Sequence, residues 1–201
     1  MKYLLIVVIV VAIIVIAVQI YFTISMSKIE THHYTVISQK GNVEVRKYDP
    51  AIFINYTEKG GMFQVQNNAF RNLAGYLFGS NAREQKIAMT APVQMEQKDN
   101  DAVMRFMIPS EYKLKDLPAP TNSKVLMTEE PAFYAAAIRY SGFNNESKFQ
   151  KHKKQLEEFI SNEKSELDGA FIFLGYNPPF QWFGRKNEVL VKIESIGIAV
   201  P

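Results

Sequence analysis

The chain has 201 residues, no cysteine and a net charge of +3 at neutral pH, from 23 basic and 20 acidic side chains. Acids and bases are interspersed, and there is no zinc-finger spacing or clustered basic stripe, so we expect no nucleic-acid partner. The lack of cysteine excludes disulfides, thiolate catalysis and lipoprotein attachment at the N-terminus.

A long apolar run opens the chain. Residues 3–24 carry no charge and only two clearly polar side chains, Gln19 and Thr23. At 1.5 Å per residue, such a helix reaches about 33 Å, enough to cross a hydrocarbon core of roughly 30 Å. The run is longer than the roughly 7–15 apolar residues of a signal peptide, and residues 25–27 match a cleavage site poorly. We therefore predict a transmembrane anchor over 1–27, with a cleavable signal peptide as the alternative.

The orientation and the segment after the anchor follow from few residues. Basic groups near the two ends of the run give a near tie, but a short N-terminus favours the inside, so we expect a single-pass protein with an extracytoplasmic domain. Residues 28–40 are predicted as a linker and 41–201 as one ligand-binding domain. His32 and His33 lie in the linker. They are either ligands on a flexible arm or, as we favour, polar residues near the membrane.

Periodicity predicts strand, strand, helix, strand, strand in the first half of the domain. Alternation of apolar and polar residues marks the strands, and an apolar stripe at helical spacing marks the helix, which ends at a glycine. The predicted elements are strands at 43–48 and 51–57, a helix from 63 up to Gly79, and strands at 88–95 and 103–108.

The second half repeats this order. Its predicted elements are strands at 125–128 and 133–140, a helix over 149–160, and strands at 171–176 and 188–194. Equivalent positions such as Val43 and Val125 lie about 82 residues apart. We predict an α+β fold in which two β-β-α-β-β repeats, about 41–112 and 121–196, form a distorted, mostly antiparallel β-barrel or curved sheet flanked by two helices.

Few side chains are suited to catalysis. No hydrolase or metalloprotease motif occurs, so we expect no enzymatic activity. His152 falls on the apolar stripe of the second predicted helix, between Phe149 and Leu156. It can present a ring nitrogen to iron at the edge of an apolar site, or it can be a packed residue with a backbone partner; both readings stay open.

An aromatic segment precedes the last predicted strand. Asn-Pro-Pro at 177–179 makes a rigid turn, and three aromatic and two basic residues follow, namely Phe180, Trp182, Phe183, Arg185 and Lys186. This composition suits either a planar acidic ligand or a loop packed against the sheet.

Three segments resemble the SOUL haem-binding proteins. Residues 87–93 read Ile-Ala-Met-Thr-Ala-Pro-Val, similar to the family signature, and 175–189 and 43–51 resemble its later loop and its opening strand. The resemblance covers roughly 34–194 and implies a distorted β-barrel with two helices, similar to the effector-binding domains of bacterial multidrug sensors. Met89 belongs to the signature, which we interpret first as a structural element.

The resemblance also implies a binding surface. In this family haem rests against an apolar surface beside the first helix, with basic residues near the propionates. The matching candidates here are Phe63, Phe70, Leu73 and Leu77, with Arg71 or Lys86 as charge partners, and His152 is the candidate metal ligand. We predict a membrane-anchored, non-enzymatic domain that reversibly binds b-type haem or a related tetrapyrrole. The alternative is a sensing or interaction domain for another amphipathic molecule or a protein, without haem.

Overall fold

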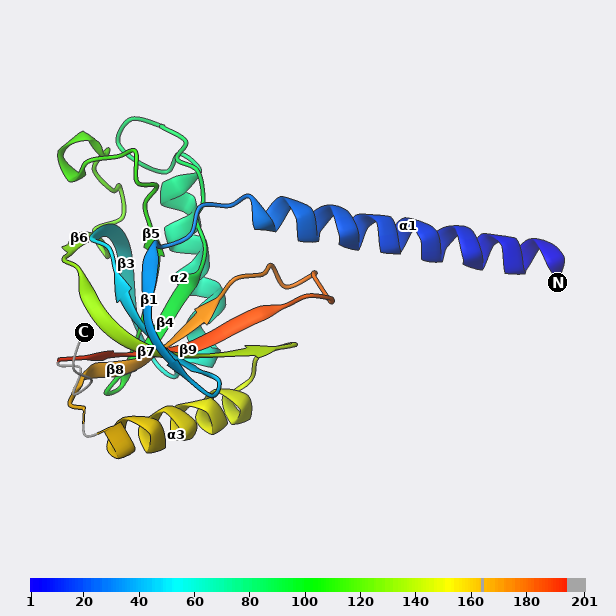
Figure 1. Cartoon of the computed structure of the whole chain (residues 1–201). Helices are drawn as coiled ribbons and strands as arrows, with labels where there is room; N and C mark the ends of the chain where they lie inside the picture. The colour runs from blue at the N-terminus through cyan, green and yellow to red at the C-terminus, as the bar shows by residue number, and fades with distance from the viewer. Residues whose placement is uncertain (164, 195–201) are drawn as a thin grey trace.

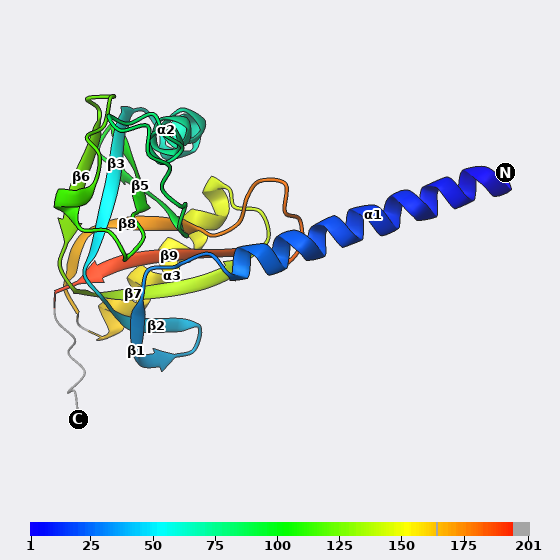
Figure 2. The ribbon, with the colours of Figure 1, turned by 90° about the horizontal axis from the view of Figure 1, so that it is seen from above.

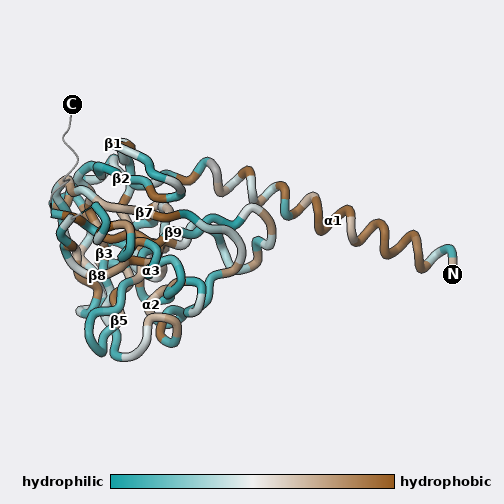
Figure 3. The backbone as a smooth tube through the Cα atoms, turned by 60° about the horizontal axis from the view of Figure 1, so that its bottom comes forward, coloured by the Kyte–Doolittle hydropathy of each residue, from teal (hydrophilic) through white to brown (hydrophobic). Residues whose placement is uncertain are grey.

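The chain is described by a computed structural model that covers residues 1–163 and 165–194. The last seven residues of the predicted domain, 195–201, lie outside the described residues. Helix α1 (Lys2–Ser27) projects away from the domain and is apolar along most of its length (Figures 1 and 3). It is long and apolar enough to cross a membrane, and nearly all of its side chains are exposed.

Nine antiparallel strands form a single curled sheet. Its order is β1-β2-β7-β9-β8-β4-β5-β3-β6, so strands from the two halves of the chain pair with each other. The strands are β1 (Tyr34–Lys40), β2 (Val43–Tyr48), β3 (Ala51–Lys59), β4 (Val93–Lys98), β5 (Asp101–Met107), β6 (Val125–Glu130), β7 (Phe133–Ser141), β8 (Leu167–Gly175) and β9 (Lys186–Ile193). The α+β class and the curled antiparallel sheet are thus confirmed.

Two helices cover the two halves of one sheet face (Figures 1 and 2). Helix α2 (Met62–Leu77) packs on β3 and β5, and α3 (Glu146–Glu163) packs on β7 and β9. A short 3₁₀ helix, η1 (Leu114–Asp116), lies in the connection between the halves. The apolar core lies between these helices and the sheet, where Leu73, Leu77 and Leu156 are completely buried. Burial of such stripes is the main source of stability for both helices.

The sheet is arranged symmetrically about its centre. Each half contributes β-β-α-β-β, as β2–β5 and β6–β9. The first strand of each half pairs with the second strand of the other, since β2 pairs with β7 and β6 with β3. This exchange ties the halves into one body. A repeat at the level of sequence stays a prediction.

Two predicted boundaries need correction. The strand predicted at 88–95 begins at Val93, because Pro92 has no N–H to donate to a neighbouring strand. Residue Thr90 instead donates its hydroxyl to the carbonyl of Met107 at 2.7 Å. The second difference is β1, which lies within the segment 28–40 predicted as a linker. It is an edge strand with mostly exposed side chains, so it lacks the alternation that marks a half-buried strand.

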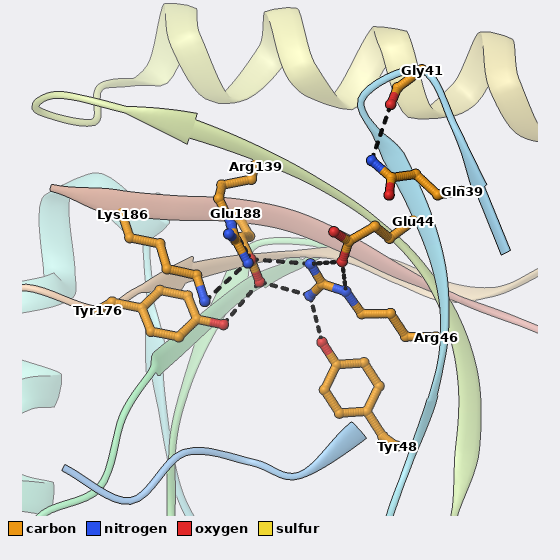
Figure 4. A network of polar contacts seen from close by, with 9 residues as sticks. All are labelled: Gln39, Gly41, Glu44, Arg46, Tyr48, Arg139, Tyr176, Lys186 and Glu188. Atoms are coloured by element: carbon orange, nitrogen blue, oxygen red, sulfur yellow. Dashed lines mark hydrogen bonds and ion pairs between the residues drawn. The ribbon is translucent and has the colours of Figure 1, made fainter. Parts of the chain in front are cut away.

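A buried ion pair joins β2 to β9 across β7 on the sheet face opposite the helices (Figure 4). Arg46 on β2 contacts Glu188 on β9 through two hydrogen bonds, Nη1 to Oε2 at 2.8 Å and Nη2 to Oε1 at 3.1 Å. Both side chains are essentially inaccessible to solvent. The intervening strand β7 carries Ala135 and Ala137 on this face. Because alanine is small, the guanidinium can cross β7 and reach Glu188.

Further polar groups complete the environment of Glu188. The Tyr176 hydroxyl donates to Oε2 at 2.8 Å, Arg139 Nε donates to Oε1 at 3.1 Å, and Lys186 Nζ lies 3.4 Å away. Burial alone would raise the pKa of Glu188, but hydrogen bonds from Arg46 and the charges around it outweigh burial and lower the pKa to about 2. Glu188 is therefore ionised across the physiological pH range.

Replacement of the buried carboxylate should destabilise the fold. We expect Glu188→Gln to lower the free energy of unfolding by roughly 3 kcal/mol, because Arg46 loses its fully buried counter-charge and keeps only the partly exposed Glu44. Urea unfolding of the full-length protein in detergent micelles at pH 7 measures the change. The matched control is Glu44→Gln, which removes the partly exposed second partner of Arg46 and should cost less than about 1 kcal/mol. Equal losses would contradict this assignment.

The same carboxylate should make stability depend on pH. Its pKa falls from an ordinary 4.5 to about 2 on folding, so its contribution is complete above pH 4.5 and declines as the pH falls toward 2. The shift corresponds to roughly 3 kcal/mol. We therefore expect the stability difference between the wild type and Glu188→Gln, followed by urea midpoints, to shrink over that interval. A constant difference would refute the linkage.

Candidate functional site

The apolar residues predicted on α2 have two different roles. Leu73 and Leu77 are completely buried between α2 and the sheet. Phe63 is partly buried, with its ring 6.1 Å from that of Phe149 on α3, while Phe70 is 38% exposed and packs edge-on against Phe106 at 5.3 Å. Of these four predicted residues, only Phe70 therefore offers a large apolar surface to a ligand.

The two predicted charge partners are exposed and lie away from Phe63. Arg71 follows Phe70 on α2, and the segment carrying Lys86 runs beside the end of the helix, where Ile87 N donates to Leu77 O at 2.8 Å. Helix α2 rises about 21 Å from Phe63 to Leu77 at 1.5 Å per residue. The structure thus spreads the predicted set along α2, with Phe63 near its N-terminal end, Phe70 and Arg71 at its middle, and Leu77 and the segment carrying Lys86 at its C-terminal end.

An exposed aromatic residue that the sequence reading passed over lies at the same end. Phe78, just beyond the last residue of α2, is 61% exposed. It follows Phe70 by eight residues, which places both on one side of a helix of 3.6 residues per turn. The spacing was a usable signal, and it was missed because Phe78 lies next to the glycine that ends the helix.

His152 is a packed residue of α3 with one engaged nitrogen. Its ring stacks on the ring of Tyr140, with centroids 4.0 Å apart and an interplanar angle of 10°. Nδ1 lies 2.7 Å from the Lys148 carbonyl, which can only accept, so Nδ1 carries the proton and Nε2 holds the free lone pair. The residue lies on a different helix from Phe70, Arg71 and Lys86. Within the described residues, no group of three or more His, Asp or Glu side chains is placed to hold a metal ion.

His32 is a buried residue, which corrects the interpretation of this position as a polar linker residue. Its Nε2 donates to the Asp49 carbonyl at 2.7 Å, and its ring lies 4.9 Å from Tyr48 and 5.6 Å from Phe53. Nδ1 is buried and has no hydrogen-bond partner among residues 1–163 and 165–194, and burial lowers the pKa of His32 below its ordinary value. His33 is exposed, with Nδ1 3.6 Å from the Asp49 carboxylate.

The connector between α1 and β1 is therefore fastened to the domain. Besides His32, Glu30 accepts hydrogen bonds from Ala91 N to its carbonyl and from Ser110 N to its carboxylate, both at 2.9 Å. Thr31 forms a β-bridge with Ala91. The six residues 28–33 leave little freedom between the helix and the sheet.

A large open groove lies beside this connector. It has a volume of about 1210 Å³ and is bounded by four separate segments, namely 30–33, 49–52, 107–113 and 129–131. Its apolar lining includes Ile52, Met107 and Tyr112. Four acidic residues line it against one lysine. The charged residues are Glu30, Asp49, Glu129, Glu130 and Lys113.

The acidic character of the groove comes mainly from two side chains. Glu130 is paired with Arg105 and Lys192, and Glu30 accepts from Ser110. Asp49 and Glu129 are exposed at the groove. Since opposite charges attract most where solvent is partly excluded, the groove favours a cation over the two propionates of haem.

The cations of the aromatic segment are both engaged within the protein. Arg185 Nη1 donates to the carbonyls of Pro178 and Gln181, each at 2.7 Å. Lys186 turns toward Glu188 and lies 3.8 Å from the Tyr176 ring centroid. These contacts shape the loop itself and leave its aromatic rings outward.

The comparisons with known proteins agree with the resemblance drawn from the sequence. The pattern of the SOUL heme-binding protein family matches residues 29–192. Mouse heme-binding protein 2 is 29% identical over 160 residues, which cover 75% of this chain and 78% of that protein. Heme-binding protein 1 of Xenopus laevis is 26% identical over 154 residues, covering 73% and 80%.

Solved structures share the fold at low sequence identity. The C-terminal domain of EcmrR superposes with a TM-score of 0.60 at 9% identity, covering 81% of this chain and 99% of that one. A hydrolase from Listeria innocua gives 0.55 at 9% identity, covering 78% and 93%. The likeness to these structures concerns architecture alone. Because the family pattern spans the whole domain, the chain belongs to the SOUL heme-binding protein family.

Proposed function

We propose that this protein is a membrane-anchored domain that binds haem or a related tetrapyrrole reversibly and catalyses no reaction. The observation that carries the proposal is the match of residues 29–192 to the SOUL heme-binding protein family. The length and exposure of α1 support a single membrane span. We place the domain on the extracytoplasmic side because a short N-terminus favours the inside. The matching element order of the two halves supports a duplicated β-β-α-β-β unit.

The C-terminal half of α2 is the proposed haem surface. Phe70, at the middle of the helix, and Phe78, just beyond its end, are exposed and supply apolar area for a flat macrocycle. Arg71 and Lys86 are exposed cations that suit two propionates. Leu73 and Leu77 are core residues that support this surface from below, whereas Phe63 lies at the other end of α2 beside Phe149. Binding would rest on stacking and charge pairing.

Iron ligation by His152 is tested separately from haem binding itself. Only Nε2 has a free lone pair, and the ring is held face to face with Tyr140. Because α3 is a different helix from α2, we expect b-type haem to bind without this ligand. His152→Ala should therefore leave the Soret maximum of the complex unchanged, whereas a shift of the maximum would establish His152 as a ligand.

A haem titration of the full-length protein in lipid nanodiscs tests the main proposal. We expect a saturable Soret shift, with empty nanodiscs as the blank and albumin as the positive control. Arg71→Glu/Lys86→Glu should weaken haem affinity roughly tenfold or more, because two favourable charge contacts become repulsive. The matched control Lys151→Glu makes the same kind of change at an exposed position on α3. No saturable shift in the wild type would refute haem binding.

A second candidate function rests on the acidic groove. An amphipathic cation would place its apolar part on Ile52, Met107 and Tyr112, with its charge near Asp49 and Glu129. This corresponds to a sensing domain that binds an amphipathic molecule other than haem. Concave, mostly apolar sites with a few polar groups are the usual form of small-molecule sites.

Thermal unfolding distinguishes the two functions. If the groove is the functional site, aromatic quaternary ammonium compounds should raise the melting temperature while uncharged analogues of the same shape should not. Asp49→Asn/Glu129→Gln should abolish the increase, and Asp99→Asn, at the exposed β4–β5 turn, should preserve it. Stabilisation by haem alone would rule out this second function.

A further inference from the structure

The loop between β8 and β9, residues 176–185, reaches the C-terminal end of α1 (Figure 2). We call it the β8–β9 loop. Its contacts with α1 join residues about 160 positions apart in the sequence. Nothing in the haem proposal uses this loop. It is the place where the domain touches the helix that we propose as the anchor.

Gln19 connects α1 to this loop through both ends of its amide. Nε2 donates to the Phe180 carbonyl at 3.1 Å, and Oε1 accepts from Trp182 N at 2.9 Å. Gln19 is only 7% exposed on a helix whose other side chains are mostly exposed. Placing an amide group without hydrogen bonds in hydrocarbon costs roughly several kcal/mol of free energy. The two hydrogen bonds of Gln19 therefore remove most of the cost of having this polar residue in the span.

One aromatic contact and one hydrogen bond extend the same interface. The rings of Phe22 and Phe180 lie 4.6 Å apart, and Gln181 Nε2 lies 3.4 Å from Thr23 Oγ1. The loop therefore packs along one full turn of α1. Its height relative to the helix is fixed by these contacts.

The loop directs large apolar side chains outward at this height. Phe180, Trp182 and Phe183 are 50%, 55% and 65% exposed, and Phe143 on the neighbouring β7–α3 connection is 51% exposed. Arg185 links the two segments, since its guanidinium lies 4.5 Å from the Phe143 ring centroid. A cluster of this kind in water is costly, whereas Trp and its aromatic neighbours are favoured at a membrane interface.

The expected depth of the bilayer agrees with this position. If the hydrocarbon core begins at Tyr3, a thickness of roughly 30 Å takes about 20 residues and ends near Phe22. The loop meets α1 at residues 19–23. Its aromatic rings would then lie at the boundary between the acyl chains and the headgroups.

Several backbone polar groups of the loop are hydrogen-bonded to side chains, as a position near hydrocarbon requires. Arg185 binds the carbonyls of Pro178 and Gln181, and the Gln181 side chain donates to the Phe183 carbonyl at 2.9 Å. The Asn177 carboxamide accepts from Lys186 N at 2.6 Å. Irregular backbone near hydrocarbon is tolerated only when such groups are satisfied.

We propose that the β8–β9 loop is a second membrane contact, which inserts its aromatic rings into the interface and seats the domain on the lipid bilayer. This rests on the proposed role of α1 as a membrane anchor. The occupant is lipid, because the loop is continuous with the span and lies at its expected boundary.

Trp182 is the single tryptophan of the chain, so its fluorescence reports on the loop directly. The full-length protein is reconstituted into phosphatidylcholine vesicles whose acyl chains are brominated either near the headgroup or near the bilayer centre. We expect a short-wavelength emission that shallow bromines quench more strongly than deep ones. Vesicle flotation after alkaline wash is measured on the same samples.

A relocated tryptophan provides the matched control. Trp182→Phe/Leu126→Trp moves the fluorophore to β6, where Leu126 is 59% exposed and several strands distant from the loop. We expect its emission to be unquenched by either lipid. Phe180→Ser/Phe183→Ser should keep flotation but reduce the quenching of Trp182.

The possible outcomes separate the two proposals. Flotation without quenching of Trp182 would overturn membrane contact by the loop and leave the anchor intact. Unquenched emission at short wavelength would mean that protein, such as a second copy of the chain, covers the loop, and would also overturn it. Loss of flotation would refute the proposal that α1 is a membrane anchor. It would also refute membrane contact by the β8–β9 loop, which rests on that proposal.

Discussion

The pairing of Arg46 with Glu188 across β7 is the interaction on which the sheet depends. It joins β2 to β9, and β7 between them must carry small residues, as it does at Ala135 and Ala137. A one-residue slip of either strand would move one charge to the helix-covered face. Because buried charges without partners are costly, the pair selects one register. The same carboxylate contacts Tyr176, the first residue of the β8–β9 loop, and Lys186, the first residue of β9 after it.

Much of the architecture could be predicted from the sequence, since periodicity reports burial on one face. The helices and eight of the nine strands were placed close to their observed bounds for this reason. The ninth, β1, was not predicted because an edge strand that is exposed to solvent on both faces shows no alternation of apolar and polar residues. The burial of His32 could not be predicted from the local sequence pattern either. It depends on Tyr48 and Phe53, which reach it only after the sheet has curled.

The candidate site was less accessible to prediction, for two physical reasons. An apolar stripe looks the same whether it faces a core or a ligand, and Leu73 and Leu77 turned out to face the core. The acidic groove, by contrast, is assembled from four turns separated by up to about 100 residues, so no continuous motif marks it. The surface on α2 and the acidic groove differ in charge. Arg71 and Lys86 suit an anionic ligand, whereas Asp49 and Glu129 suit a cationic one.

The fastened connector at 28–33 determines how the domain would move in a bilayer. A flexible tether would let a domain tumble independently and sweep through a hemisphere of solvent. Here the connector is bonded to the sheet through Glu30 and His32, and Gln19 adds a contact from the helix itself. With α1 in a membrane, helix and domain would turn together, at the slow rotational rate of a membrane-embedded body. The surface at the end of α2 would then keep a constant height above the lipid, so a ligand released from the bilayer or from solvent would always approach it from the same direction.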